Sequence, residues 1–146
     1  MSTKEAQEKI VSNMVRWQKV EKASIVSTGK IMDETENPII SLVAEIIQRD
    51  SQMHKRVQEL IQDSLETKTF ALTPEDLGEI WSMVEAHIEI ERSTIALAKA
   101  SLETIGKNKG LTVQAYLLEY LLMDEEKHDA MLSKLESIKK NMYPYG

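Results

Sequence analysis

The sequence contains no cysteine, and it has few glycine, proline and aromatic residues. The absence of cysteine from its 146 residues excludes disulfides, thiolate metal sites, iron–sulfur clusters and cysteine nucleophiles. Only 5 Gly and 3 Pro interrupt the chain, and aromatic residues make up 5% of it, a composition that favours a mostly helical protein over a sheet-rich or disordered one. No apolar run reaches the roughly 18 residues of a membrane-spanning helix, so we expect no membrane segment.

The charge and composition also limit the kinds of partner and the cellular location that we expect. The net charge is −6 and no cluster of Lys and Arg has the length of a nucleic-acid footprint, so we expect no nucleic-acid partner. Residues 1–5 carry no apolar stretch of a secretion signal, which makes a cytoplasmic location the default expectation. With 42% hydrophobic and 29% charged residues, the chain fits one domain, residues 1–146, with a single core.

Start and stop signals predict four long helices, over about residues 3–33, 38–64, 74–105 and from 112 to beyond 138. Asn37 and Thr73 each stand before a proline, which combines a cap with the residue best suited to the first helical position. Gly106 ends the third helix. The segment 66–72 is expected to be extended, and residues 143–146 to be a frayed or surface-docked tail.

Each predicted helix has a stripe of residues at steps of three and four, which we expect to face a shared core. The stripes are Ile10, Met14, Trp17, Glu21, Ser24, Thr28 and Ile31; Ile40, Val43, Ile47, Ser51, His54, Val57 and Ile61; Leu77, Trp81, Val84, Ile88, Glu91, Ile95, Ala98, Leu102 and Ile105; and Leu117, Leu121, Glu125, His128, Leu132, Leu135 and Ile138. Four amphipathic helices joined by short loops predict an all-α fold, a four-helix bundle.

Five polar side chains interrupt these stripes near the middle of the helices: Glu21, His54, Glu91, Glu125 and His128. A carboxylate in a core costs several kcal/mol unless it is paired or bound to a metal. Residues three apart on a helix point the same way, so Glu125 and His128 can serve one ion. Carboxylates combined with imidazole suit iron or manganese. The pattern therefore predicts a metal site shared by the four helices.

The two halves of the chain resemble one another. Residues 21–25 match residues 91–95 in character at an offset of 70, and residues 50–54 match 124–128 at an offset of 74. This duplication predicts two helical hairpins that bring equivalent ligands face to face. One corner departs from the pattern, because Ser51 stands where Glu125 stands in the second half. The neighbouring Asp50 is a substitute ligand, a hydrogen-bond partner of a ligand, or a surface residue.

With these spacings from Glu to His and the Asp-Glu-Glu-x-His run at 124–128, the chain resembles the ferritin-like superfamily over all four helices, and within it the rubrerythrin-type (erythrin) domain. The resemblance implies two hairpins with a crossover between the second and third helices, which ten extended residues, 65–74, would span over about 33–36 Å. It also implies an oxo-bridged di-iron centre that oxidises Fe(II) or reduces peroxide or oxygen. A homodimer is expected, and an external electron donor, since the rubredoxin module of rubrerythrins is missing.

Ser51 leaves alternatives open. The site holds two iron ions with Asp50 as a sixth group, or one ion, with manganese or zinc in place of iron, or no metal. In the last case the histidines hydrogen-bond to Glu21 and Glu91, and the bundle acts as an interaction or assembly module. His87, one turn before Glu91, is an extra ligand, a partner of a ligand, or a partly buried histidine. An up-down-up-down topology is the alternative to the crossover, and no catalytic residue is assigned.

Overall fold

Four α-helices make up most of residues 1–142, the part of the chain that the computed structural model describes, the side chains of Pro74 and of residues 141 and 142 excepted. They are α1 (Thr3–Glu34), α2 (Pro38–Glu66), α3 (Pro74–Ile105) and α4 (Thr112–Met142), with a short 3-10 helix, η1 (Lys109–Leu111), before α4. No strand occurs among these residues, so the prediction of an all-α fold with four helices is confirmed. The predicted tail, residues 143–146, lies outside the described residues.

Local hydrogen bonds explain where the helices begin and end. The Asn37 side chain accepts hydrogen bonds from the backbone N–H groups of Ile39 (2.9 Å) and Ile40 (3.2 Å), two donors that the first turn of α2 leaves free. Thr73 and Asp76 form a capping box at the start of α3. Hydrogen bonds from the Thr73 side chain and backbone lower the pKa of Asp76. Gly106, at a φ of 54°, ends α3.

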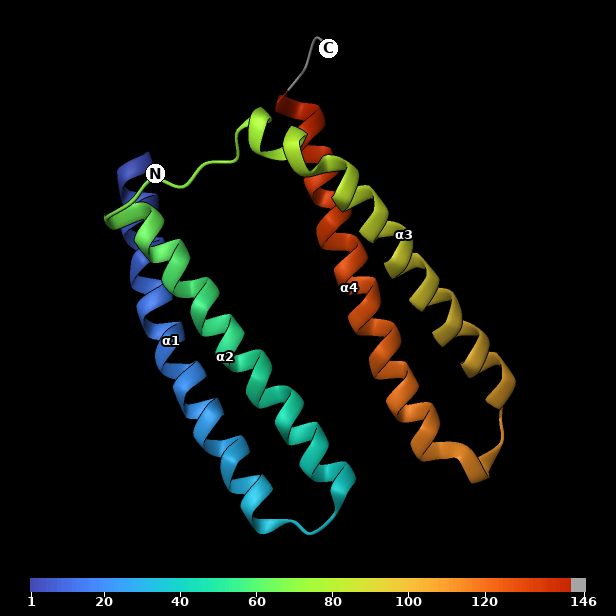
Figure 1. Cartoon of the computed structure of the whole chain (residues 1–146). Helices are drawn as coiled ribbons and strands as arrows, with labels where there is room; N and C mark the ends of the chain where they lie inside the picture. The colour runs from blue at the N-terminus through green and yellow to red at the C-terminus, as the bar shows by residue number, and fades with distance from the viewer. Residues whose placement is uncertain (143–146) are drawn as a thin grey trace. The chain divides into compact units, whose positions relative to one another are not determined.

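The helices form two antiparallel hairpins, in which α1 packs along α2 and α3 packs along α4 (Figure 1). The chain divides into two compact units, Met1–Ala71 and the part from Leu72 onward. The four-helix bundle and the single domain stay predictions.

The connection between the hairpins is shorter than the sequence predicts, because α2 continues to Glu66. Residues 67–73 have no helix or strand, and seven extended residues reach at most about 23–25 Å. The 29 residues of α2 rise about 43 Å along the helix axis. The crossover and the up-down-up-down topology both stay predictions.

The seam of the α1–α2 hairpin, the line of buried residues along which α1 and α2 contact each other, is largely polar. Its buried residues recur every seven positions on both helices, a spacing that keeps side chains at one line of contact between two helices. They are Met14, Glu21 and Thr28 on α1, and Ala44, Ser51 and Gln58 on α2. Four of these six are polar, so hydrogen bonds as well as apolar contacts hold this seam together.

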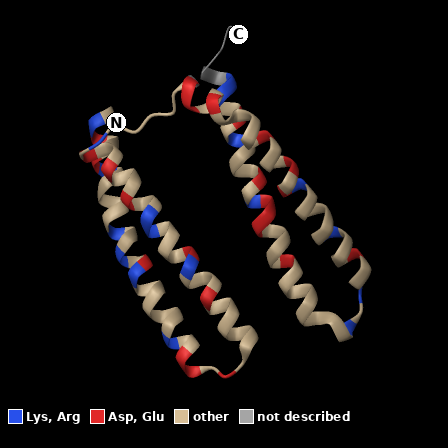
Figure 2. Cartoon of the chain, in the orientation of Figure 1, with Lys and Arg blue, Asp and Glu red and all other residues tan. Residues whose placement is uncertain are grey.

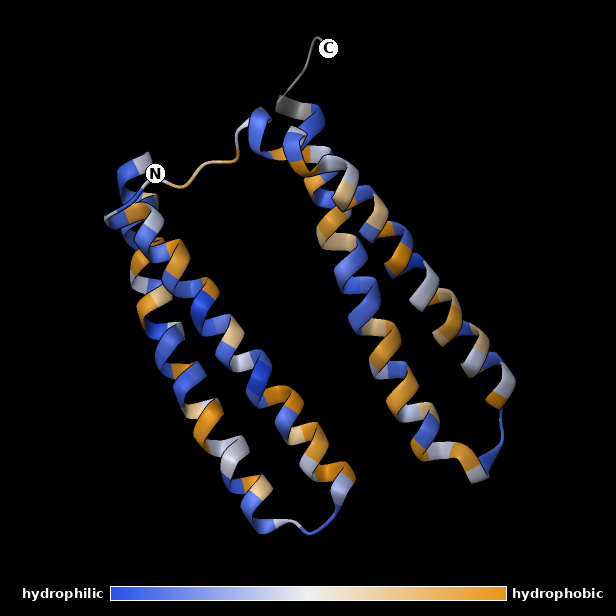
Figure 3. Cartoon of the chain, viewed as in Figure 1, coloured by the Kyte–Doolittle hydropathy of each residue, from blue (hydrophilic) through white to orange (hydrophobic). Residues whose placement is uncertain are grey.

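Only part of each predicted stripe is buried within its hairpin. On α1, Ile10, Trp17 and Ile31 are 41%, 51% and 44% exposed, and on α2 Ile40 and Ile47 are also exposed. A single partner helix covers only the middle of each stripe, so the residues along the edge of the stripe remain exposed to solvent. Figure 3 shows apolar residues along the helices of both hairpins. Each hairpin thus presents apolar surface that a further partner can cover.

Charged residues are distributed along all four helices. In the view of Figure 2, acidic and basic residues are interspersed along α1 and α2, and the middle of α4 carries the acidic run of residues 124–126. None of the described helices combines the length and the apolar character that crossing a membrane requires.

Replacing Asn37 by Ala removes the cap of α2. We expect the free energy of unfolding to fall by about 1 kcal/mol, the usual cost of losing such a cap, when urea denaturation is followed by circular dichroism. Glu36→Ala, in the same loop but bonded to neither amide, is the control and should change stability by less than about 0.5 kcal/mol. An equal loss in both variants would contradict the role of the cap.

Candidate metal centre

Three of the predicted ligands meet in the α3–α4 hairpin. Glu91 of α3 and Glu125 and His128 of α4 each offer a ligand atom, and these atoms all lie within 4.8 Å of one another. His128 Nδ1 is 3.4 Å from Glu91 Oε1 and 3.7 Å from Glu125 Oε2. Glu125 and His128 are three residues apart and so project from the same side of α4. Glu91, only 6% exposed, faces them across the seam.

The distances suit a single transition-metal ion. Neighbouring donors that each lie about 2.0–2.2 Å from one ion are about 2.8–3.6 Å apart, close to the two distances that His128 makes. The second oxygen of Glu91, Oε2, is buried and has no hydrogen-bond partner among the described residues. Buried polar atoms are almost always paired, and an orphan needs an explanation such as a bound ion. The residues present therefore fit a metal ion.

Glu91 is held in its ionised form. A hydrogen bond with the Glu125 carboxyl group is the largest cause that lowers the pKa of Glu91. Burial acts in the opposite direction, while the hydrogen bond with His87 and the charges of His128 and His87 lower the pKa further. His87 Nε2 lies 2.9 Å from Glu91 Oε1. A lowered pKa keeps the carboxylate ready for a metal, which binds only the deprotonated form.

Other side chains orient the ligands. The Thr94 hydroxyl donates a 3.0 Å hydrogen bond to Glu125 Oε2, and Asp124 Oδ2 lies 3.5 Å from His128 Nε2. With Nε2 facing Asp124, Nδ1 of His128 points to the two glutamates. Such contacts behind a ligand fix its direction and raise the basicity of an imidazole.

The α1–α2 hairpin contains the corresponding Glu–His pair without the third ligand. His54 Nδ1 lies 3.5 Å from Glu21 Oε1, much like the pair of His128 and Glu91. The Gln58 side-chain amide donates a 3.3 Å hydrogen bond to the same Glu21 oxygen. At the remaining corner, the hydroxyl groups of Ser24 and Ser51 are 2.8 Å apart and hydrogen-bonded. Hydrogen bonds thus occupy this seam where the other hairpin gathers ligands.

These contacts agree with the duplication seen in the sequence. Ser24 and Thr94 are 70 positions apart, and Ser51 and Glu125 are 74 apart. The hydroxyl pair of the first hairpin therefore occupies the positions at which Thr94 bonds to Glu125 in the second. Ser51 is the structural counterpart of Glu125, and its hairpin has no cluster of three ligands among the described residues.

Asp50 joins neither group of ligands. It is half-buried on α2 and makes no hydrogen bond or ion pair with the described residues, so no contact marks it as a substitute for the missing glutamate. Sequence reasoning also missed Gln58, Thr94 and Asp124. Gln58 carried a usable signal, since it follows Ser51 by seven positions and His54 by four. His87, for which the sequence left three roles open, hydrogen-bonds to Glu91 and has a side chain that is 54% exposed.

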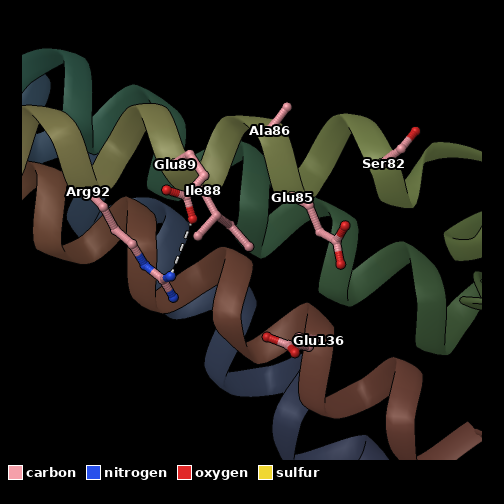
Figure 4. Close-up of a pocket in the computed structure, with 7 residues that line it drawn as sticks. All are labelled: Ser82, Glu85, Ala86, Ile88, Glu89, Arg92 and Glu136. Atoms are coloured by element: carbon pink, nitrogen blue, oxygen red, sulfur yellow. Dashed lines mark ion pairs between the residues drawn. The ribbon is translucent and has the colours of Figure 1, made fainter.

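A separate hollow on the α3–α4 hairpin is lined by charged residues (Figure 4). Glu85, Glu89 and Arg92 come from α3 and Glu136 from α4, and Arg92 Nη1 lies 3.6 Å from Glu89 Oε1. None of the three ligand residues lines it. The hollow and the ligand cluster are thus distinct features of the hairpin.

Comparison with protein-family models, with curated proteins and with solved structures finds no match. Assignment of a function therefore depends on the ligand types of the α3–α4 hairpin and on their geometry.

The pKa of Glu91 gives a pH-dependence that can be measured. Because the folded-state pKa lies below the ordinary value of 4.5, ionised Glu91 contributes stability above that value. The contribution is lost as the pH falls through the folded pKa. We expect the Tm of the metal-free wild-type protein to fall relative to that of Glu91→Gln below about pH 4.5. Glu89→Gln, with a side chain 76% exposed on the same helix, should track the wild type. A constant difference between wild type and Glu91→Gln would contradict the lowered pKa.

Proposed function

We propose that the chain is a metal-binding carboxylate protein of ferritin-like, rubrerythrin-like type, which binds iron and oxidises Fe(II) or reduces peroxide or oxygen. One observation carries the proposal: Glu91, Glu125 and His128 converge in one hairpin, and the buried Oε2 of Glu91 has no partner among the described residues. Two carboxylates and one imidazole are hard and borderline ligands, a set that suits iron or manganese and that zinc also accepts.

Each residue of the cluster has a distinct part in this proposal. Glu91 would bind as a terminal ligand, with His87 Nε2 placed 2.9 Å from its Oε1. Glu125, whose Oε2 accepts a hydrogen bond from Thr94, would supply the second carboxylate and would bridge if two ions are bound. His128 binds through Nδ1, with Asp124 behind it. Bound iron would supply the one-electron chemistry, and the electrons would come from an external donor protein, because the chain has no cysteine for a rubredoxin-type site.

A four-helix bundle would close this site from water. Leu97 and Leu121, near Glu125, are 67% and 46% exposed in the α3–α4 hairpin. A second hairpin packed on this face would bury them and the ligand cluster together. Two hairpins are the minimum for a bundle core, and a second ion needs ligands from that second hairpin.

The first experiment is an anaerobic Fe(II) titration of the metal-stripped protein. We expect at least one iron per chain to remain after desalting, counted by elemental analysis, and a ligand-to-metal absorption band in the near ultraviolet when peroxide is added. If iron is retained but peroxide causes no spectral change, the metal site is supported and the proposed redox activity is contradicted. Loss of all metal on desalting would contradict the proposal.

Substitution at the centre of the cluster tests the ligands. Glu91→Leu should abolish iron retention and lower the Tm of the metal-free protein at neutral pH, because His87 and His128 lose the carboxylate that they contact. Glu89→Leu, two residues along the same helix and outside the cluster, should retain iron like the wild type. Iron retention by Glu91→Leu, or unfolding of this variant without any change in metal binding, would count against the site.

A second candidate function has support in the α1–α2 hairpin. There the hydrogen bond from Gln58 to Glu21 and the hydrogen bond between Ser24 and Ser51 pair polar side chains across the seam without a metal. Such a layer favours a protein that keeps the fold as an interaction or assembly module, with polar contacts that set helix register. The iron titration separates the two functions, since an assembly module would retain no metal.

A further inference from the structure

We propose that the α3–α4 hairpins of two copies of this chain pack face to face on a two-fold axis and that together they complete a two-metal site. Each copy supplies Glu91, Glu125 and His128. This inference rests on the proposed metal-binding function and adds to it the partner that provides the second set of ligands.

The ligand types favour a second copy over the α1–α2 hairpin. Two-metal carboxylate bundles take a Glu from each of two helices and a Glu-x-x-His from each of the other two. One α3–α4 hairpin supplies half of this set, and a second copy supplies the identical half. The α1–α2 hairpin has Ser51 at the Glu position, bonded to Ser24, and its Glu21 oxygen is held by Gln58.

The charges also balance in the symmetric pair. Two copies of the cluster bring together four carboxylates, a charge of −4, which two divalent ions neutralise. Pairing with the α1–α2 hairpin would bring only three carboxylates, those of Glu21, Glu91 and Glu125. In the absence of metal, four desolvated carboxylates repel one another. Assembly of the two copies is therefore coupled to metal binding.

An apolar surface suited to this contact lies beside the ligands. A groove on the α3–α4 hairpin is lined by Leu97, Leu118 and Leu121 together with Thr94 and Glu125. The ligand cluster thus borders the surface that a partner would cover.

The line of exposed apolar residues on α3 has the spacing of a helix-packing seam. Met83, Ile90 and Leu97 are seven residues apart and are 67%, 56% and 67% exposed. Their counterparts 70 positions earlier are Asn13, Val20 and Ser27, so the corresponding line of α1 is not apolar, and the exposed Ile10, Trp17 and Ile31 belong to a different line of that helix. A seven-residue apolar repeat packs well against a copy of itself.

The test measures mass and metal content on the same sample. Metal-stripped full-length protein is titrated anaerobically with Fe(II) and examined by sedimentation velocity. We expect a species of twice the 16.6 kDa chain mass that contains one iron per chain. The dimer dissociation constant should fall by roughly 5–150-fold on iron binding, the range of ordinary coupling between two binding events.

Two matched substitutions locate the contact. Leu97→Glu should abolish the iron-dependent dimer, while Ser27→Glu, at the corresponding position of the other hairpin, should leave it intact. Both positions are exposed, so circular dichroism should show unchanged helix content. Dimer loss in both variants or in neither would overturn the proposed contact.

The outcomes separate this inference from the function on which it rests. If the protein retains iron but stays a monomer, the proposed dimer is contradicted and the metal-binding function still stands. A dimer whose stability does not change with iron would likewise overturn the shared site. Failure of the wild-type chain to retain any iron would remove both.

Discussion

A carboxylate placed in the seam between two helices is the constraint on which both hairpins depend. Glu21 and Glu91 are each 6% exposed at the middle of their helices, where an uncompensated charge is strongly destabilising. Each hairpin surrounds its glutamate with a histidine from the facing helix, at 3.5 Å in one and 3.4 Å in the other. The remaining contacts of the two glutamates differ between the hairpins.

The two hairpins differ in the residues that surround their buried glutamates. Ser51 in place of Glu125 removes one carboxylate, and Gln58 adds an amide that holds Glu21. In the second half, His87 stands where the first has Trp17, and it contributes to the lowered pKa of Glu91. In the first seam the oxygen without a hydrogen-bond partner is that of the Gln58 amide, whereas in the second it is a carboxylate oxygen, Glu91 Oε2.

The four helices follow from local signals in the sequence, because caps such as Asn37 and the residue Gly106 act within one turn. The glutamates and histidines of the site were identifiable because polar residues break an apolar stripe. The residues that face each other across each seam were not identifiable from the sequence. A stripe at steps of three and four shows which side of a helix is buried, but it does not show which helix covers that side. That is why Ile10 and Trp17 were expected in a core and are exposed. Gln58 was missed because its role depends on the facing Glu21.

The hairpin architecture has a consequence for the order of folding. In each hairpin the helices that pack together are neighbours in the sequence, and the α1–α2 turn consists of only residues 35–37. Contacts between chain neighbours lose little loop entropy and form quickly. Glu91 and His128 are joined by a single short return of the chain, so their encounter requires no long-range search. The ligand cluster is thus expected to assemble early, as a local event, and to be present before any slower association of larger parts begins.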